Sequence, residues 1–178
     1  MGDYITTYTK VHFTPLTPHA EDLRIEDIAH ALSLMTRANG HFPEFYSVGQ
    51  HCIACCRESM ARRYDKRLSL ACLLHDAGEA YLADITRPVK IHMEYYNKTE
   101  KRLLSVIYEH YLGSDLTKEE TIAVADVDDT LLYHEFYHYM GEILFQSGSV
   151  LRSKPEFAFR PFSEVEKEYL ELFRRLSC

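Results

Sequence analysis

The chain lacks the features that mark membrane proteins and exported proteins. It has no apolar run of about 18 residues, which is the shortest stretch typical of a transmembrane helix. Its first ten residues, MGDYITTYTK, contain no apolar core of a signal peptide. We therefore expect a cytoplasmic protein that does not associate with a membrane.

Positive charge is also scarce. The sequence has 20 lysines and arginines against 27 aspartates and glutamates, which gives a formal net charge of −7 at pH 7, and it has no basic stripe. Nucleic-acid binding needs clustered cations that neutralise phosphates, so we expect no nucleic-acid partner. Any smaller anionic substrate would need cations placed locally, close to its site.

Cysteine does not follow the spacing of a zinc ribbon or of a disulfide framework. Cys52 and Cys55 have no second C-x-x-C pair elsewhere in the chain. Together with Cys56 they fall on one predicted helix, which disfavours disulfides between them. We expect all the cysteines, including Cys72 and Cys178, to be reduced core residues.

The length and composition of the chain are typical of one helical domain. The chain has 178 residues, 46% of them hydrophobic and 26% charged, within the usual size of a single domain, about 50 to 250 residues. We predict one domain over residues 1–178 and a long loop over residues 146–161. The fold class that we predict is all-α, a compact helical bundle with a metal site between its helices. Apolar spacing predicts helices over residues 24–37, 47–62, 66–80, 88–112, 117–142 and 162–175.

Polar side chains interrupt the apolar faces of three of these helices. His75 and Asp76 close the apolar run LSLACLLHD, His51 lies in an apolar stretch, and three aspartates follow in residues 126–129. Burying a neutral polar group costs about 2 to 7 kcal/mol unless it is paired or coordinated, and a carboxylate costs more. One histidine, one His-Asp pair and a later aspartate form the ligand set of a mononuclear divalent-metal site, suited to Co, Mn, Zn or Mg.

The order H, then HD, then D resembles the HD-domain phosphohydrolase superfamily. The similarity continues through HDAGEAYLADI at residues 75–85 and RPVK at residues 87–90. This pattern is similar to a small bacterial and phage branch that includes 5′-deoxynucleotidases and phage deoxynucleoside triphosphate hydrolases. Gly40-His41 and FYSVGQH at residues 45–51 resemble the phage members. The resemblance covers about residues 24–135 of a motif-bearing core of about residues 24–142.

The resemblance implies a set of metal ligands, which are His51, His75, Asp76 and one aspartate of residues 126–129. Asp128 is our choice, because on a helix its neighbours Val124 and Leu131 would face the core. Asp126 and Asp129 stay open as alternatives. A solvated helix start is the structural alternative for all three, since acids favour a first turn.

The resemblance also implies catalytic and substrate-binding residues. If the helix continues past Asp76, Glu79 presents its carboxylate on the same face as the His-Asp pair, as a general acid or base would. Asp84 matches a position that orients the attacking water; a turn cap is its structural alternative. Arg62 and Arg63 are expected to be solvated charges at a helix end. The residues expected to contact the substrate are Arg37, His41, Arg87 and Lys90, with Phe42, Phe45 and Tyr46 available to line a base pocket.

These expectations combine into a metal-dependent enzyme that cleaves a deoxynucleotide at the phosphate attached to the sugar. We expect a deoxynucleoside triphosphate hydrolase, with dATP as a reasonable substrate, that gives deoxynucleoside and triphosphate. Alternatives are a 5′-deoxynucleotidase, a cyclic-nucleotide or alarmone hydrolase, and a non-catalytic metal-binding or nucleotide-binding module. The many tyrosines and phenylalanines, and relatives that form dimers or hexamers, favour a homo-oligomer.

Overall fold

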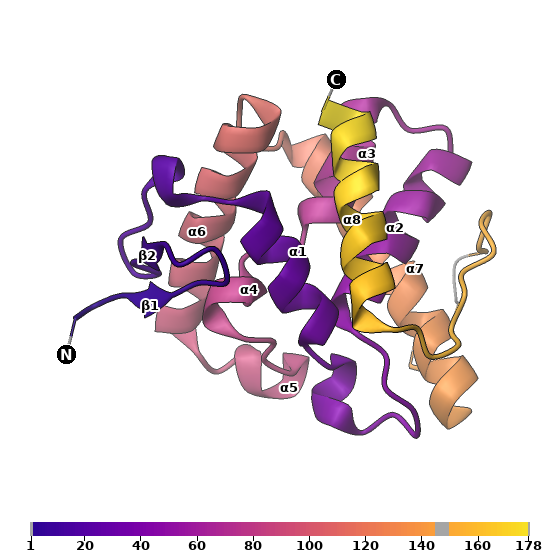
Figure 1. Ribbon diagram of the computed structural model, residues 1–178. Helices are drawn as coiled ribbons and strands as arrows, with labels where there is room; N and C mark the ends of the chain where they lie inside the picture. The colour runs from indigo at the N-terminus through magenta and orange to yellow at the C-terminus, as the bar shows by residue number, and fades with distance from the viewer. Residues whose placement is uncertain (1, 145–149, 178) are drawn as a thin grey trace.

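The computed structural model describes residues 2–144 and 150–177, and it is mostly helical (Figure 1). The predicted all-α fold class is confirmed. The helices are α1 (Ile25–Leu34), α2 (Val48–Ala61), α3 (Lys66–Leu74), α4 (Glu79–Leu82), α5 (Arg87–Lys90), α6 (Glu94–Leu112), α7 (Lys118–Met140) and α8 (Phe162–Ser177), with short 3-10 turns η1 (Ala20–Asp22) and η2 (Arg37–Gly40). A small antiparallel hairpin of β1 (Ile5–Thr6) and β2 (His12–Phe13), which apolar spacing did not predict, precedes them.

Helices α2 and α3 form the centre of the bundle. They pack against each other, α8 lies across α1, α2 and α3, and α7 packs on α2 and α3 (Figure 1). Helix α3 is apolar on nearly all sides, and residues from Leu70 to Leu74 are at most 2% exposed. Each fully buried leucine stabilises the fold by about 1.5 to 3 kcal/mol. The residues that follow Leu74 therefore start from a rigidly packed element.

Side-chain caps set the starts of α2 and α3, the helix that carries His51 and the helix that leads into His75. Ser47 and Gln50 form a reciprocal capping box that begins α2 four residues before His51. Asp65 caps α3 by accepting a hydrogen bond from the backbone N–H of Leu68 at 2.8 Å. Such caps satisfy the otherwise unpaired N–H groups of the first turn, so they fix where along the chain each helix begins.

Three predicted helices are shorter than expected. The helix predicted over residues 66–80 ends at Leu74, where the imidazole of His75 donates a hydrogen bond to the carbonyl of Cys72 and caps the helix end. The helix predicted over residues 24–37 ends at Leu34, because the next two residues are extended and Thr36 pairs with Ser47. A turn between α5 and α6 interrupts the helix predicted over residues 88–112.

The remaining structural expectations have mixed outcomes. Within the predicted loop, residues 150–161 are irregular, and residues 146–149 lie outside the described residues. The cysteines of the described residues, which are Cys52, Cys55, Cys56 and Cys72, are free and buried as expected; Cys178 lies outside this range. None of the described helices combines the length and apolar character needed to cross a membrane.

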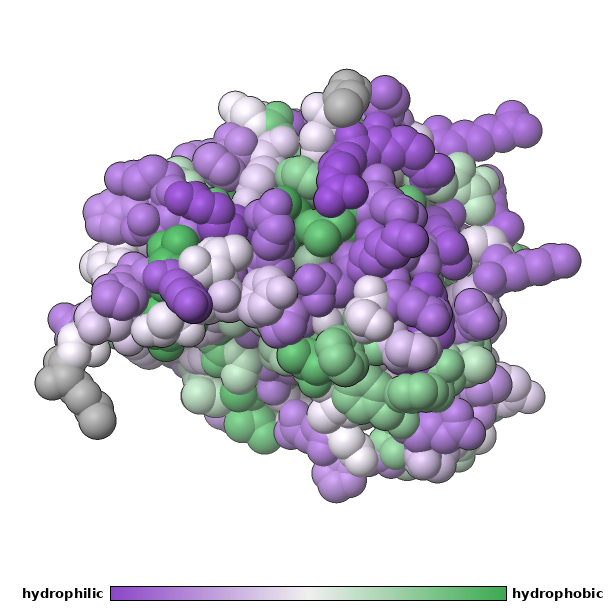
Figure 2. All heavy atoms as spheres, viewed as in Figure 1, coloured by the Kyte–Doolittle hydropathy of each residue, from purple (hydrophilic) through white to green (hydrophobic). Residues whose placement is uncertain are grey.

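The face shown in Figure 2 is mostly hydrophilic, with apolar patches in the lower half of the view and smaller ones near the upper centre and the left. Large apolar side chains are exposed where α5 meets α6, among them Val89, Ile91 and Tyr95. The predicted homo-oligomer stays a prediction.

Candidate metal centre and substrate pocket

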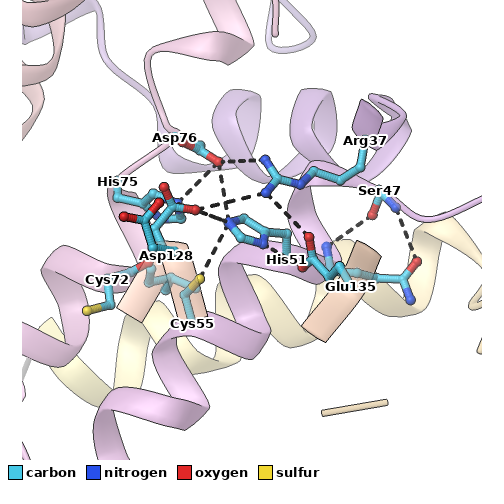
Figure 3. A network of polar contacts seen from close by, with 12 residues as sticks. Arg37, Ser47, His51, Cys55, Cys72, His75, Asp76, Asp128 and Glu135 are labelled. Atoms are coloured by element: carbon cyan, nitrogen blue, oxygen red, sulfur yellow. Dashed lines mark hydrogen bonds and ion pairs between the residues drawn. The ribbon is translucent and has the colours of Figure 1, made fainter. Parts of the chain in front are cut away.

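Three helices bring the four predicted metal ligands to one point. His51 comes from the middle of α2, His75 and Asp76 follow the end of α3, and Asp128 comes from α7 (Figure 3). His51 Nε2 lies 3.2 Å from His75 Nε2 and 3.1 Å from Asp128 Oδ1. His75 Nε2 lies 3.2 Å from Asp76 Oδ2. Residues up to 77 positions apart in sequence thus form one cluster.

A hydrogen bond at Nδ1 of each imidazole fixes the orientation of the ring, so that Nε2 faces the cluster. His51 Nδ1 lies 2.6 Å from Glu135 Oε1, and His75 Nδ1 lies 2.9 Å from the carbonyl oxygen of Cys72. A carboxylate and a carbonyl only accept hydrogen bonds, so both Nδ1 atoms carry the proton. Each Nε2 atom faces the cluster, where it shares a proton with a carboxylate or, once that proton leaves, offers a lone pair to a metal ion. An acceptor on the outer Nδ1 and an inward-facing Nε2 are typical of histidines that ligate a metal.

A divalent cation fits this cluster. Once both Nε2 atoms have lost their protons, their lone pairs face each other at 3.2 Å and repel unless a positive charge lies between them. Asp76 Oδ2 is buried and has no well-formed hydrogen bond within the described part of the chain, although His75 Nε2 lies 3.2 Å away and the guanidinium of Arg37 lies 3.6 Å away. Orphaned buried oxygens are costly, and a metal ion would satisfy this one. The cluster of histidine and aspartate side chains could therefore hold a metal ion.

The charges of the cluster also favour a cation. Burial alone would raise the pKa of Asp128, but hydrogen bonds from His51 and His75 lower that pKa well below its ordinary value. Burial likewise opposes a charge on His75, yet the adjacent Asp76 carboxylate raises the pKa of His75 overall. Positive charge at this point is thus favoured, and a bound ion would displace the protons that otherwise supply it.

The structure separates the three aspartates of α7 by their partners. Asp126 pairs with Arg62, and Asp129 Oδ1 accepts a hydrogen bond from Arg87 at 2.8 Å. Of these three aspartates of α7, Asp128 faces the two imidazoles. The expectation that Arg62 is a solvated charge is wrong, because it is nearly buried and pairs with the fully buried Glu58 at 2.9 Å.

A cavity of about 430 Å³ opens beside the cluster. Most of the predicted site residues line it, namely Arg37, Asp76, Glu79, Asp84, Arg87, Lys90 and Asp128, and its apolar wall includes Phe42, Leu132, Phe136 and Leu144. The structure does not bring His41 to this cavity: its side chain is exposed on the turn after η2. The cavity therefore has one polar end beside the metal cluster and one apolar wall.

The carboxyl group of Glu79 is protonated at neutral pH. Its side chain is 5% exposed, and burial, with the nearby Asp76 and Asp84, raises the pKa of Glu79 to about 9. Glu79 begins α4 rather than continuing α3, but Gly78 before it keeps a helical backbone conformation. The carboxyl therefore still reaches the cavity, and it could donate a proton there.

Arg37 lies beside the cluster and links its acids. Its guanidinium nitrogens lie 3.6 Å from Asp76 Oδ2, 3.9 Å from Asp128 Oδ1 and 3.4 Å from Glu135 Oε2 (Figure 3). Burial opposes its charge, but these carboxylates raise the pKa of Arg37, so it stays charged. Arg37 thus offsets part of the negative charge of the site before any ion binds.

Two further cations at the cavity are already paired. Arg87 donates to Asp129 as described above and lies 3.9 Å from Asp128 Oδ2, and Lys90 lies 2.6 Å from Glu100 Oε1. A phosphate group in the cavity would share or displace these acidic partners. Paired cations of this kind are held in place by their partners, which favours a defined position for an anionic ligand.

Sequence reasoning assigned no role to two residues of the cluster, Glu135 and Cys55. Glu135 lies two helical turns after Asp128, so a search for polar residues on the same face of α7 would find it. Cys55 lies one turn after His51 on α2, and its Sγ is 3.5 Å from His51 Nε2. A cysteine among apolar residues resembles an ordinary core residue, so the sequence around Cys55 does not indicate a metal ligand.

No protein-family model matches this chain. It is 35% identical to the uncharacterized protein YfdR of Escherichia coli strain K12 over 108 residues. This matched segment covers 61% of this chain and 58% of that protein. It is 37% identical to an uncharacterized protein of Rhodobacter capsulatus over 99 residues, and this segment covers 52% of this chain and 50% of that protein. The chain thus spans between half and three fifths of the length of these curated relatives.

Proposed function

We propose that this chain is an HD-domain phosphohydrolase that uses a divalent metal ion to hydrolyse deoxynucleotides. One observation carries the proposal: the Nε2 atoms of two imidazoles and the carboxylates of Asp76 and Asp128 converge at the polar end of a cavity. The order of the ligands along the chain, H, then HD, then D, supports membership of the superfamily.

The neighbouring side chains supply the other parts that hydrolysis needs. A bound divalent ion supplies polarisation of a phosphoryl oxygen and a more acidic water. Arg37, Arg87 and Lys90 neutralise the phosphate oxygens, and Asp84 orients the attacking water. As the bond between phosphorus and the sugar oxygen breaks, Glu79 gives its proton to that oxygen. The products are a deoxynucleoside and the released phosphate or triphosphate.

The shape of the cavity fits a nucleotide. Its volume of about 430 Å³ falls within the usual range for small-molecule sites, roughly 300 to 1,000 Å³. Phe42 and Phe136, which contact each other edge to face, stand at the apolar wall, where a base would pack. The phosphates would then lie at the polar end, beside the cluster.

We propose deoxynucleoside triphosphates, with dATP as the first candidate, because the FYSVGQH segment resembles the phage members. The alternative substrate is a deoxynucleoside monophosphate. It is favoured by the pairing of Arg87 with Asp129 and of Lys90 with Glu100, which leaves less positive charge for a triphosphate. Both substrates would be cleaved at the same bond.

Product analysis with all four deoxynucleoside monophosphates and all four triphosphates tests the proposal. We expect nucleoside and triphosphate from one base, and loss of this activity in His75→Ala. His41→Ala is the matched control, because His41 is exposed and does not line the cavity. Cleavage of monophosphates alone would favour the 5′-deoxynucleotidase. Turnover of only cyclic or 3′-pyrophosphorylated nucleotides, or none at all, would overturn the proposal.

A further inference from the structure

A buried thiol lies within the candidate metal centre. Cys55 is 1% exposed and follows His51 by one turn of α2, so both side chains point the same way (Figure 3). The donor atoms of His51, Cys55, His75 and Asp128 all lie within 4.8 Å of one another. The sulfur therefore belongs to the same group of atoms as the two imidazoles and the aspartate.

The separations between these atoms are short enough for the atoms to bind one ion. Bonds of about 2.0 to 2.1 Å to nitrogen and about 2.3 Å to sulfur place tetrahedral ligand atoms roughly 3.3 Å apart for two nitrogens and roughly 3.6 Å apart for nitrogen and sulfur. The two Nε2 atoms are 3.2 Å apart, and His51 Nε2 is 3.5 Å from Cys55 Sγ. His51 Nε2 is also 3.1 Å from Asp128 Oδ1, and His75 Nε2 is 3.7 Å from it.

The other buried cysteines differ from Cys55. Cys56 and Cys72 belong to neither of the two groups of potential metal ligands found among the described residues. Cys52 lies with His75 and Asp76 in the second group, which includes neither His51 nor Asp128. Cys55 is the cysteine that joins residues from both other elements of the centre, α7 and the end of α3.

We propose that the Cys55 thiolate is a further ligand of the metal centre, and that the centre consequently selects Zn²⁺ or Co²⁺ over Mg²⁺ and Mn²⁺. This inference rests on the metal centre of the proposed function. Thiolates prefer borderline and soft ions, whereas sites of carboxylate and water suit Mg²⁺ and Mn²⁺. When the ion binds, the thiol proton passes to solvent, so metal loading releases a proton from Cys55.

X-ray absorption spectroscopy of the full chain loaded with one equivalent of Zn²⁺ tests this inference. We expect one sulfur scatterer at about 2.3 Å together with nitrogen and oxygen scatterers at about 2.0 to 2.1 Å. A wild-type spectrum with nitrogen and oxygen scatterers alone would overturn it, and this result needs no variant to fold.

Variants then identify the sulfur. Cys55→Ser should lose the sulfur scatterer and bind Zn²⁺ more weakly by more than the roughly 10- to 100-fold that loss of an outer hydrogen-bond partner causes. Cys56→Ser, the next residue on the same helix and equally buried, is the matched control and should keep both. A sulfur scatterer that persists in Cys55→Ser and disappears in Cys52→Ser would refute the assignment to Cys55.

The outcome is separable from that of the proposed function, because the spectrum does not depend on turnover. A zinc–sulfur bond in a protein that cleaves no nucleotide would support the ligand and refute the activity. Nucleotide cleavage by a protein without that bond would refute the ligand and leave the activity standing.

Discussion

Replacement of Glu135 tests whether the structure holds His51 ready for a metal ion. Glu135 is fully buried on α7 and accepts a hydrogen bond from His51 Nδ1 at 2.6 Å. Burial would raise its pKa, but His51 and Arg37 lower the pKa of Glu135 overall, so the group is a carboxylate. It therefore orients the imidazole and makes Nε2 a stronger donor to an ion.

The expected magnitudes differ between two substitutions. Glu135→Gln keeps an oxygen that can accept from Nδ1 but loses the charge, and we expect metal affinity to fall roughly 10- to 100-fold, which is about 1.4 to 2.7 kcal/mol. Glu135→Ala also leaves the guanidinium of Arg37 without its buried partner 3.4 Å away. Removing one partner of a buried ion pair costs about 3 to 5 kcal/mol in the free energy of unfolding.

Calorimetric titration with Zn²⁺ and unfolding in urea measure the two quantities. Glu119→Gln is the matched control, because Glu119 is an exposed glutamate of the same helix. Wild-type metal affinity in Glu135→Gln, together with wild-type stability in Glu135→Ala, would refute the idea that this carboxylate positions His51.

The other predictions address the remaining parts of the site. Asp128→Asn should abolish metal binding, whereas Asp126→Asn should leave it intact, because Asp126 pairs with Arg62 instead; equal losses in calorimetry would contradict the assignment. Glu79→Gln should lower turnover by about 10²- to 10⁴-fold. Since the pKa of Glu79 is raised to about 9, the acid form is present below that pH, and the wild-type rate should fall as the pH rises past it. A wild-type profile without this alkaline decline would exclude Glu79 as the acid. Arg62→Ala should reduce the free energy of unfolding by about 1 to 3 kcal/mol, measured in urea, because it removes a hydrogen-bond partner of the buried Glu58; an unchanged midpoint would show that this pair contributes nothing.

The metal cluster could be predicted because its polar residues lie within apolar segments of the sequence. His51, His75 and Asp76 stand in apolar segments, where an unpartnered polar group is costly, so the sequence itself indicates a common partner. The choice among the three aspartates of α7 needed the structure. Helical periodicity favours Asp128, but it does not predict the ion pairs that Asp126 and Asp129 form with residues distant in the sequence.

Other features escaped prediction for local physical reasons. Helix α3 ends where the side chain of His75 caps the carbonyl of Cys72. The apolar spacing through residues 66–80 does not predict such a hydrogen bond. Cys55 has the polarity of a core residue, so only its distance from His51 reveals it as a potential ligand. Glu135 is buried because His51 donates a hydrogen bond to it and because Arg37, from the segment before α2, neutralises its charge.

The account depends most directly on a link between bound metal and hydrolysis. The measurement is nucleoside release from the best deoxynucleotide substrate while metal-free protein is titrated with a divalent ion. We predict that release rises in proportion to the bound ion, saturates at one ion per chain and is absent from Asp128→Asn. Release that persists without metal, or that is unchanged in Asp128→Asn, would contradict the account.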